Sequence, residues 1–357
     1  MRHLPLFLAL TLTLGGCDLL NTVPKPPTDT TSGQSPTTNV ATDSVRPTTT
    51  YMYVFNGLGK TIDEINLKTM TVTKGILSTG LYPNQFVTEG ATTYLVNSGD
   101  ANLFKLDLHA RAKLDTINLT TGSNPMSLTL LGSNQGLVTN NMTNYVSWID
   151  LATKTQEATE SIRGAAGGGA AIANGKAYVP SVEADYSNWP TIGYAFSGIQ
   201  VYDLATRKLL KTIALADDAL SSYYLTTDIG TDPNGKVEVA TKTGVVVIDP
   251  TTDTVSQTIQ VGAPTNNLQF VSATKAYASA AQGMVSFNPT TGAILRGTDN
   301  TINSGGGSFK IFGKAAYVAN FASDSIRVID LETEQASGSD LLVGDGPQDL
   351  TFITVAD

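Results

Sequence analysis

The motif Ile149-Asp150-Leu151 ends one short apolar segment, and six related motifs end other apolar segments along the chain. The seven motifs are Ile65-Asn66-Leu67, Leu106-Asp107-Leu108, Ile149-Asp150-Leu151, Tyr202-Asp203-Leu204, Ile248-Asp249-Pro250, Phe287-Asn288-Pro289 and Ile329-Asp330-Leu331. Their Asp or Asn residues stand at 66, 107, 150, 203, 249, 288 and 330, so the steps are 41, 43, 53, 46, 39 and 42 residues. Short strands and turns that return about every 40 residues are typical of β-propeller blades. The sequence therefore predicts an all-β fold, a seven-bladed β-propeller over residues 51–357.

Each repeat is expected to hold four short strands, with the innermost strand following a turn such as Gly80 to Pro83. Innermost strands are expected at 85–87, 127–130, 170–173, 225–227, 268–271, 309–311 and 350–353. The first expected strand of the domain, 51–55, is the second strand of a blade. The C-terminal strand should therefore join the first blade, which closes the ring and removes an open sheet edge.

The N-terminus has the pattern of an export signal. Arg2 precedes the apolar stretch from Leu4 to Leu14, which is too short to span a membrane as a helix. The only cysteine follows in Leu14-Gly15-Gly16-Cys17, which resembles the lipobox of a bacterial lipoprotein. The resemblance implies cleavage of residues 1–16, lipidation of Cys17 and anchoring to a membrane, facing the periplasm or the cell exterior. An ordinary secretory signal with an unrelated cysteine is the alternative.

Residues 17–50 are rich in Thr, Pro and Ser and lack apolar periodicity. Such a segment buries too little apolar surface to offset the entropy lost on ordering. We expect a disordered tether between the anchor and the propeller.

Composition excludes several classes of function. The formal net charge is −9 and no basic run is present, so nucleic-acid binding is not expected. Outside the signal segment the one histidine is His109, which leaves no Ser-His-Asp set and no cluster of zinc ligands. We expect no catalytic residue of these kinds and no cofactor. A hydrolase that uses carboxylates and a divalent cation stays open.

The recurring residues have structural interpretations. The Asp or Asn of each motif stands where a strand turns back, and its short side chain can accept hydrogen bonds from backbone N–H groups there. The Gly and Pro turns precede no helical pattern, so they are expected to connect blades rather than to hold phosphate. Asn56, Asn97, Asn140, Asn141, Asn144 and Asn320 fall in connections after second strands, where they act in turns or form a polar ring that faces a partner.

One region breaks the repeat. Residues 181–197 form an insertion between a second and a third strand, and the connection 216–224 into the next blade is also long. In a four-stranded meander both connections emerge on one face of the ring. The candidate ligand-binding residues are the aromatic ones: Tyr186, Trp189, Tyr194, Phe196, Tyr223 and Tyr224. The weak candidates for a metal site are Glu183, Asp185, Asp217 and Asp218. The alternative to a binding role is an internally packed Ω-type loop over the channel mouth.

The last repeat carries a family resemblance. The run Tyr317-Val318-Ala319-Asn320, then Ile326 to Asp330, then Val343-Gly344-Asp345-Gly346-Pro347 resembles the YVTN β-propeller repeat. That family occurs in periplasmic and surface proteins of bacteria and in archaeal surface layers. The resemblance implies the propeller fold and a non-enzymatic binding or scaffolding role.

Three hypotheses of function result. The first is a membrane-anchored module that recognises a protein or an envelope polymer through the face that carries the insertion. The second is a lactonase-like hydrolase that uses carboxylates and a divalent cation. The third is a purely structural surface protein.

Overall fold

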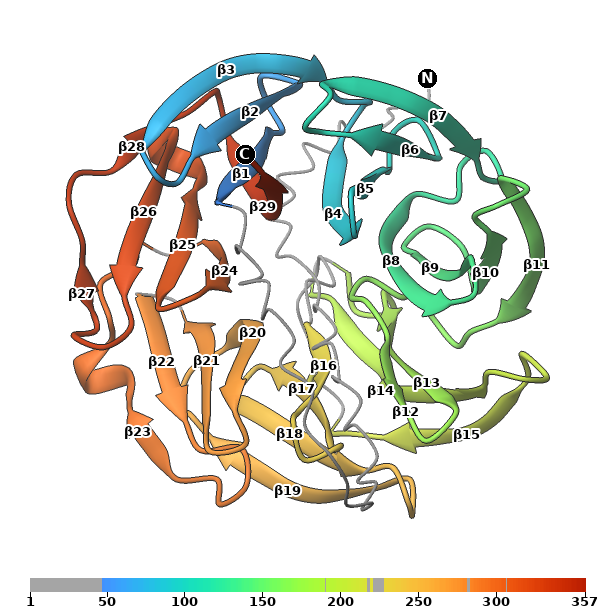
Figure 1. Ribbon diagram of the computed structural model, residues 1–357. Coiled ribbons are helices and arrows are strands. Elements are labelled where there is room, and N and C mark those ends of the chain that lie inside the picture. Colours follow the sequence, from blue (N-terminus) through green and yellow to red (C-terminus); the bar gives the residue numbers. More distant parts are fainter. Residues whose placement is uncertain (1–46, 190, 217–218, 221–227, 281–282, 306) are drawn as a thin grey trace, which may run out of the picture.

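The computed structural model describes residues 47–189, 191–216, 219–220, 228–280, 283–305 and 307–357. Their strands form seven sheets, which stand side by side around a common axis (Figure 1). The predicted seven-bladed β-propeller is confirmed. The blades are numbered here from 1 to 7 in chain order.

In each blade the four strands run antiparallel from the axis outwards. The innermost strands are β29 (Pro347–Ala356), β4 (Pro83–Glu89), β8 (Pro125–Gly132), β12 (Ala171–Ala173), β16 (Ile229–Thr231), β20 (Thr265–Ser272) and β24 (Ser308–Phe312). The second strands are β1 (Thr48–Asn56), β5 (Thr92–Asn97), β9 (Gln135–Asn140), β13 (Lys176–Asp185), β17 (Val237–Thr241), β21 (Lys275–Ala280) and β25 (Ala315–Asn320). The third strands are β2 (Thr61–Asn66), β6 (Asn102–Asp107), β10 (Tyr145–Asp150), β14 (Gly193–Asp203), β18 (Gly244–Asp249), β22 (Gly283–Phe287) and β26 (Ser325–Asp330).

The outermost strands are β3 (Thr71–Ser78), β7 (Ala112–Asn118), β11 (Thr155–Ser161), β15 (Leu209–Ala214), β19 (Thr254–Gln260), β23 (Ile294–Arg296) and β27 (Gln335–Ala336). In blade 7 a second short strand, β28 (Leu341–Leu342), also pairs with β26. Two 3-10 turns, η1 (Thr298–Asn300) and η2 (Phe321–Ser323), are the helical elements among the described residues. No described helix has the length and apolarity that a bilayer crossing requires.

The ring closes as the sequence predicts. The C-terminal strand β29 pairs with β1 from Thr48 opposite Ala356 to Asn56 opposite Pro347, and it forms the innermost strand of blade 1. The first strand begins at Thr48, three residues before the expected domain start. The expected innermost strand at 225–227 lies outside the described residues, and the innermost strand described in that blade is β16.

The core lies between neighbouring blades because each sheet is covered on both sides. Second and third strands are almost wholly buried, as in β17 and β18. Blade 3 contributes Trp148 to the cluster that it shares with blade 4, and blade 1 contributes Phe55 to the cluster that it shares with blade 2. Burial of such large side chains stabilises the ring by about 1.5–3 kcal/mol each.

The recurring Asp and Asn fix the turns between third and outermost strands. Asp150 Oδ1 accepts the backbone N–H groups of Ala152 and Thr153 at 2.8 and 2.7 Å. Equivalent bonds are made by Asn66, Asp107, Asp203, Asp249, Asn288 and Asp330. The prediction of turn chemistry at these positions is confirmed in all seven blades.

A tie between blades begins at the same turns. The residue four positions after each Asp or Asn has a positive φ, between 54° and 73°: Met70, Arg111, Lys154, Arg207, Asp253, Gly292 and Glu334. Five of these side chains are charged, and each pairs with a charged side chain of the preceding blade: Arg111 with Glu64, Lys154 with Asp115, Arg207 with Glu157, Asp253 with Lys176, and Glu334 with Lys275.

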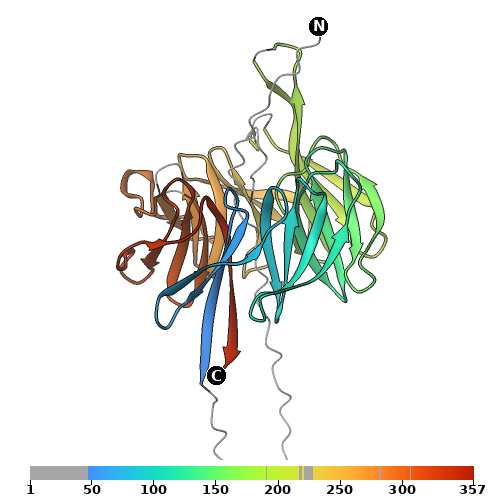
Figure 2. The ribbon, with the colours of Figure 1, turned by 90° about the horizontal axis from the view of Figure 1, so that it is seen from above.

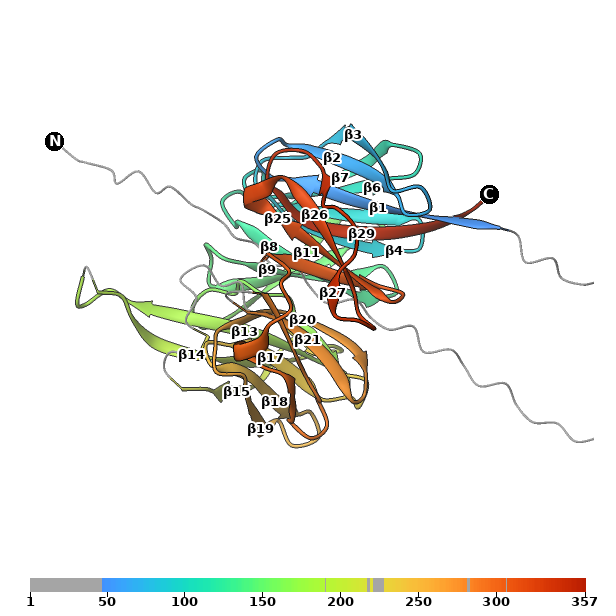
Figure 3. The same ribbon diagram turned by 90° about the vertical axis from the view of Figure 1, so that its left-hand side faces the viewer.

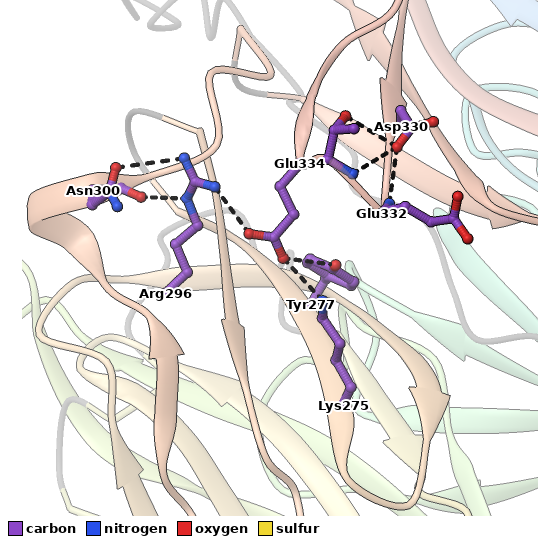
Figure 4. A network of polar contacts seen from close by, with 8 residues as sticks. Lys275, Tyr277, Arg296, Asn300, Asp330, Glu332 and Glu334 are labelled. Atoms are coloured by element: carbon purple, nitrogen blue, oxygen red, sulfur yellow. Dashed lines mark hydrogen bonds and ion pairs between the residues drawn. The ribbon is translucent and has the colours of Figure 1, made fainter.

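The tie between blades 6 and 7 shows the arrangement in detail (Figure 4). Glu334 Oε1 accepts hydrogen bonds from Lys275 Nζ and from the Tyr277 hydroxyl, both at 3.0 Å. Its other oxygen accepts from Arg296 at 2.9 Å. Three donors hold the pKa of Glu334 below its usual range, although burial opposes the shift. Blades 4 and 5 repeat this tie with Lys176, Tyr178 and Asp253.

A second set of ties runs along the innermost strands. A polar side chain of one blade accepts the backbone N–H of the next innermost strand. Asp349 accepts from Phe86, Gln85 from Leu128, Asp228 from Leu268 and Asn267 from Phe309. Innermost strands of different blades have no sheet hydrogen bonds in common, so these contacts satisfy backbone groups that would otherwise be buried without a partner.

Candidate interaction surface

The insertion of blade 4 is a β-hairpin that extends the second and third strands. β13 and β14 stay paired from Lys176 opposite Asp203 to Asp185 opposite Gly193. Figures 2 and 3 show this hairpin projecting from one side of the ring, while the outer ends of β1 and β29 point to the other side. The insertion is therefore not an Ω-type loop. We call the side of the ring with the hairpin the hairpin face and the opposite side the turn face.

The base of the hairpin is braced by the connection that enters blade 4. Ala165 and Val182 exchange backbone hydrogen bonds of 2.9 and 3.0 Å. Gly164 has a φ of +77°, and a Cβ there would lie 2.2 Å from the carbonyl oxygen of Val182, so glycine permits this close approach. Arg163 donates to Glu183 at 2.8 Å and to the carbonyl of Ala195 at 3.1 Å, which ties the two hairpin strands together.

The predicted aromatic residues divide into two groups. Tyr186 and Trp189 lie in the hairpin tip and are 55% and 66% exposed. Tyr194 is half-buried against the core cluster of blades 4 and 5. Phe196, a predicted ligand-binding candidate, is not exposed to a ligand. It is buried, and the Arg163 guanidinium lies 4.6 Å from its ring centroid, so it packs the base of the hairpin.

Only some of the remaining predicted residues lie in the part of the chain that the structure describes. Tyr223, Tyr224, Asp217, Asp218 and the lipidation residue Cys17 lie outside the described residues. Of the carboxylates that are described, Glu183 is bound by Arg163. Asp185 accepts the backbone N–H of Ser187, and this bond holds its pKa below the usual range. Within the described ranges, no group of three or more His, Cys, Asp and Glu is placed to hold a metal ion.

The asparagines of the hairpin face are largely internal. Asn56, Asn97, Asn140 and Asn320 are buried at the ends of second strands. Three of them donate a side-chain hydrogen bond to the residue five positions on: Asn56 to Thr61, Asn97 to Asn102 and Asn140 to Tyr145. Turn chemistry is thus the role that the contacts support, and these four residues do not form an exposed polar ring.

The buried asparagines also explain the recurring glycine of the connections. Gly80 donates its backbone N–H to Asn97, and a Cβ on Gly80 would lie 2.6 Å from the amide carbon of Asn97. A Cβ on Gly344 would lie 2.5 Å from the side-chain nitrogen of Asn56. Only glycine leaves room for the amide beneath the connection.

The hairpin face carries a larger apolar set than the sequence predicted. Six large apolar side chains protrude from its turns and connections, each 42–70% exposed: Leu58, Leu81, Tyr82, Met142, Tyr186 and Trp189. They belong to the connections of blades 1 to 4, so they lie along one arc of the ring. Aromatic residues and methionine are enriched in the centres of protein interfaces, where charges are depleted. The sequence singled out Tyr186 and Trp189 but not Leu58, Leu81, Tyr82 and Met142, because only the topology shows that all six lie on one side of the ring.

The turn face carries many charged groups. It carries the interblade ion pairs, such as Arg207 with Glu157, and the Asp-centred turns. The folded chain also begins there, because Pro47 lies beside the C-terminus and accepts the backbone N–H of Asp357 at 2.9 Å. The apolar arc and the start of the folded chain are therefore on opposite sides of the ring.

Comparison with known proteins supports the fold alone. The sequence matches no protein-family model and no curated protein sequence. Among solved structures, the 6-phosphogluconolactonase candidate from Bacteroides uniformis superposes with a TM-score of 0.61 at 20% identity, over 85% of this chain and 99% of that chain. AztD from Citrobacter koseri superposes with a TM-score of 0.55 at 12% identity, over 87% and 99%. The computationally designed Ika8 protein gives 0.52 at 14% identity, over 74% and 76%. The chain thus has the fold of a seven-bladed β-propeller, and identities this low carry no function.

Proposed function

We propose that the chain is an exported, lipid-anchored β-propeller of the YVTN-repeat type that binds a protein partner through its hairpin face. The observation that carries the proposal is the apolar arc from Leu58 to Trp189, which is exposed on one side of the ring. Large apolar side chains that are exposed together on one face of a soluble protein are often a site for binding another molecule. Leu58, Leu81 and Met142 are aliphatic, so a protein surface suits the arc better than a sugar polymer, which stacks on aromatic rings.

The position of the proposed tether is consistent with binding through the hairpin face. A lipid on Cys17 would connect to Pro47 on the turn face through the proposed tether of about 30 residues, which as a flexible coil would have a reach on the order of 30 Å. The lipid would then be attached on the side of the ring opposite the hairpin face, which leaves that face open. A partner would be met on the side where the apolar side chains are exposed.

The hydrolase hypothesis has no specific support among the described residues. Glu183 is neutralised by Arg163, and Asp185 is engaged by the hairpin tip. The likeness to a lactonase candidate is a likeness of fold, as it is for AztD. We therefore do not propose an enzymatic function.

The test is an in-cell crosslinking pull-down with the full lipid-anchored chain. One variant replaces residues 184–194 with a two-residue turn, which keeps the bracing pair Ala165 and Val182. A matched control carries Leu209→Ser and Leu210→Ser on the outer strand β15, where the side chains are 42% and 54% exposed.

We expect one specific protein to be captured by the natural chain and by the β15 control, and to be lost from the hairpin variant while the propeller still folds. Capture that is unchanged in the hairpin variant, or absent throughout, contradicts the proposal and favours a structural role.

A further inference from the structure

One position of the second strand is aromatic or apolar in six of the seven blades and a glutamate in the other. It is the residue that pairs with the position two before the recurring Asp or Asn. Tyrosine stands there in five blades, at Tyr53, Tyr94, Tyr178, Tyr277 and Tyr317, and blade 3 has Leu137. In blade 5 the residue is Glu238, which pairs with Val247. Each of these side chains faces the next blade, so Glu238 places a carboxyl group where the ring otherwise places an apolar or aromatic body.

The surroundings of Glu238 are apolar. Its side chain is fully buried, and neither carboxyl oxygen has a hydrogen-bond partner among the described residues. Val247 and Ala240, its neighbours on the same face of the sheet, belong to a core cluster with Leu268, Ala276, Ala278 and Phe287 of blade 6. On the other side of β17 its pairing partner is Gly230, which has no side chain. An ionised carboxylate is strongly disfavoured in such a site.

The charged groups near this part of blade 5 are already engaged. Asp232 accepts the backbone N–H groups of Asn234 and Lys236. The Lys236 ammonium pairs with Asp249 at 2.7 Å.

The groups towards blade 6 are engaged as well. Asp228 accepts from Leu268 and from the side chain of Asn267. On blade 6, Lys275 is directed to Glu334 in blade 7. Burial raises the pKa of Glu238 to about 8, and the negative charge of Asp232 adds to the shift.

Among the described residues, the same interface has no charged tie like those of its neighbours. Lys236 corresponds to Lys176 and Lys275, but it pairs within its own blade. The position that holds Asp253 in blade 5 and Glu334 in blade 7 is Gly292 in blade 6. The outer contacts described between blades 5 and 6 are neutral hydrogen bonds, such as Asn234 to Thr290 and Gln257 to the carbonyl of Thr291.

We propose that the interface between blades 5 and 6 is a proton-dependent seam, at which the ring loosens when Glu238 loses its proton. Below the unfolded-state pKa, near 4.5, the group is protonated whether the chain is folded or not, and the seam has no penalty. Between that value and about 8 the unfolded chain releases the proton while the folded chain keeps it. Opening of the seam exposes the carboxyl group to water as unfolding does, so the equilibrium constant for opening the seam rises by up to tenfold per pH unit, and the full penalty is present above pH 8.

The test is amide hydrogen exchange by mass spectrometry on the purified chain at pH 6 and pH 9, corrected for the intrinsic pH dependence of exchange. Peptides covering β17 and β21 report on the seam, and peptides covering β5 and β9 report on the opposite side of the ring. The variants are Glu238→Gln, which keeps the shape without the charge, and Glu238→Tyr, which inserts the residue found in five other blades. Glu332→Gln is the control, because Glu332 is an exposed carboxylate of the turn face.

In the natural chain and in Glu332→Gln we expect at least a tenfold loss of protection in β17 and β21 on going from pH 6 to pH 9, with little change in β5 and β9. Glu238→Gln or Glu238→Tyr should abolish this difference, and one folded variant suffices for the comparison. An equal loss of protection around the whole ring, or a loss at the seam that persists without the carboxylate, overturns the proposal.

Discussion

At the scale of single residues, the recurring Asp is a turn-fixing group whose role could be predicted from its spacing. Its carboxylate accepts N–H groups that the turn leaves without another partner, as Asp150 does with Ala152 and Thr153. The N–H of Thr153 is the largest cause of the lowered pKa of Asp150. Asn66 and Asn288 make the same bonds without a charge, so the side-chain oxygen is the part that matters.

This account predicts that Asp150→Ala destabilises the propeller while Asp150→Asn changes its melting temperature little. The alanine variant leaves two backbone donors of the turn to water, whereas asparagine keeps the accepting oxygen. The lowered pKa adds a pH dependence. The stabilisation by Asp150 is present above its unfolded-state pKa and is lost as the pH falls through its folded-state value. Thermal melts at pH 7 and pH 3 measure both effects, and equal melting temperatures for the two variants at pH 7 would refute the assignment.

Two other residues show where sequence reasoning failed. Phe196 follows the exposed tip in sequence, but strand alternation turns it under Arg163 and into the base of the hairpin. Glu238 was passed over because its strand looked like any other short apolar run. Aligning the second strands on the recurring Asp would have found it as the glutamate among tyrosines.

At the scale of elements, the turn between the third and outermost strands carries the interblade tie as well as its own geometry. The tie could not be predicted from residue type, because Met, Arg, Lys, Asp, Gly and Glu all occupy the position four after the Asp or Asn. What recurs is the positive φ, which aims the side chain at the preceding blade. The sign of the charge then varies with the partner.

Two glutamates of one turn give a direct test of the tie. Glu334→Ala removes the acceptor for Lys275, Tyr277 and Arg296, and we expect it to cost about 2 kcal/mol of the free energy of unfolding. Glu332→Ala breaks only an exposed pair with Lys314, so it should cost less than about 0.5 kcal/mol. Chemical denaturation of the two variants makes the comparison. Equal costs would show that the tie adds nothing beyond an exposed ion pair.

The hairpin was predicted as a site but not as a structure. The sequence showed an insertion with aromatic residues, and it could not distinguish a packed loop from an extended hairpin. The pairing of β13 with β14 shows that the insertion is an extended hairpin. Ser181 to Ala184 continue the alternation of β13 opposite Tyr194 to Gly198, so the extra residues lengthen two strands that were already adjacent.

The exposed tip leads to a prediction about stability. Trp189→Ala should leave the melting temperature almost unchanged, because two thirds of the side chain is already in water. Trp148→Ala, in the core between blades 3 and 4, should cost about 3–5 kcal/mol. Thermal denaturation of both variants checks the contrast. A large loss at Trp189 would mean that the tip packs on the ring and is not free to bind.

At the scale of the whole molecule, the repeat count and the phase of the first and last strands were sufficient to predict the architecture and its closure. The period determined the number of blades, and the out-of-phase ends placed the last strand in the first blade. The division into an apolar hairpin face and a charged turn face was beyond the sequence, since it depends on which side each connection emerges. The proton-dependent seam lies between blades 5 and 6, away from the arc on blades 1 to 4.

Closure makes the C-terminal strand essential. Deleting residues 348–357 removes Leu350 and Ile353 from the core and leaves β1 as an unpaired innermost edge. We expect loss of cooperative unfolding and aggregation through the exposed edge. Calorimetry and size-exclusion chromatography report both outcomes, with Thr354→Ala as a control that removes only an exposed side-chain hydrogen bond to Thr50. A truncated chain that melts at the natural temperature would contradict the closure.

The central claim is that the hairpin face is the docking surface, and in-cell photocrosslinking tests it most directly. A photoreactive residue is placed singly at 58, 142 or 189 on the hairpin face, and at 68 or 110 on the turn face, all at exposed positions. The account predicts one crosslinked partner of the same mass from the three hairpin-face positions and none from the turn face. Adducts that form equally from both faces, or only from the turn face, would contradict it.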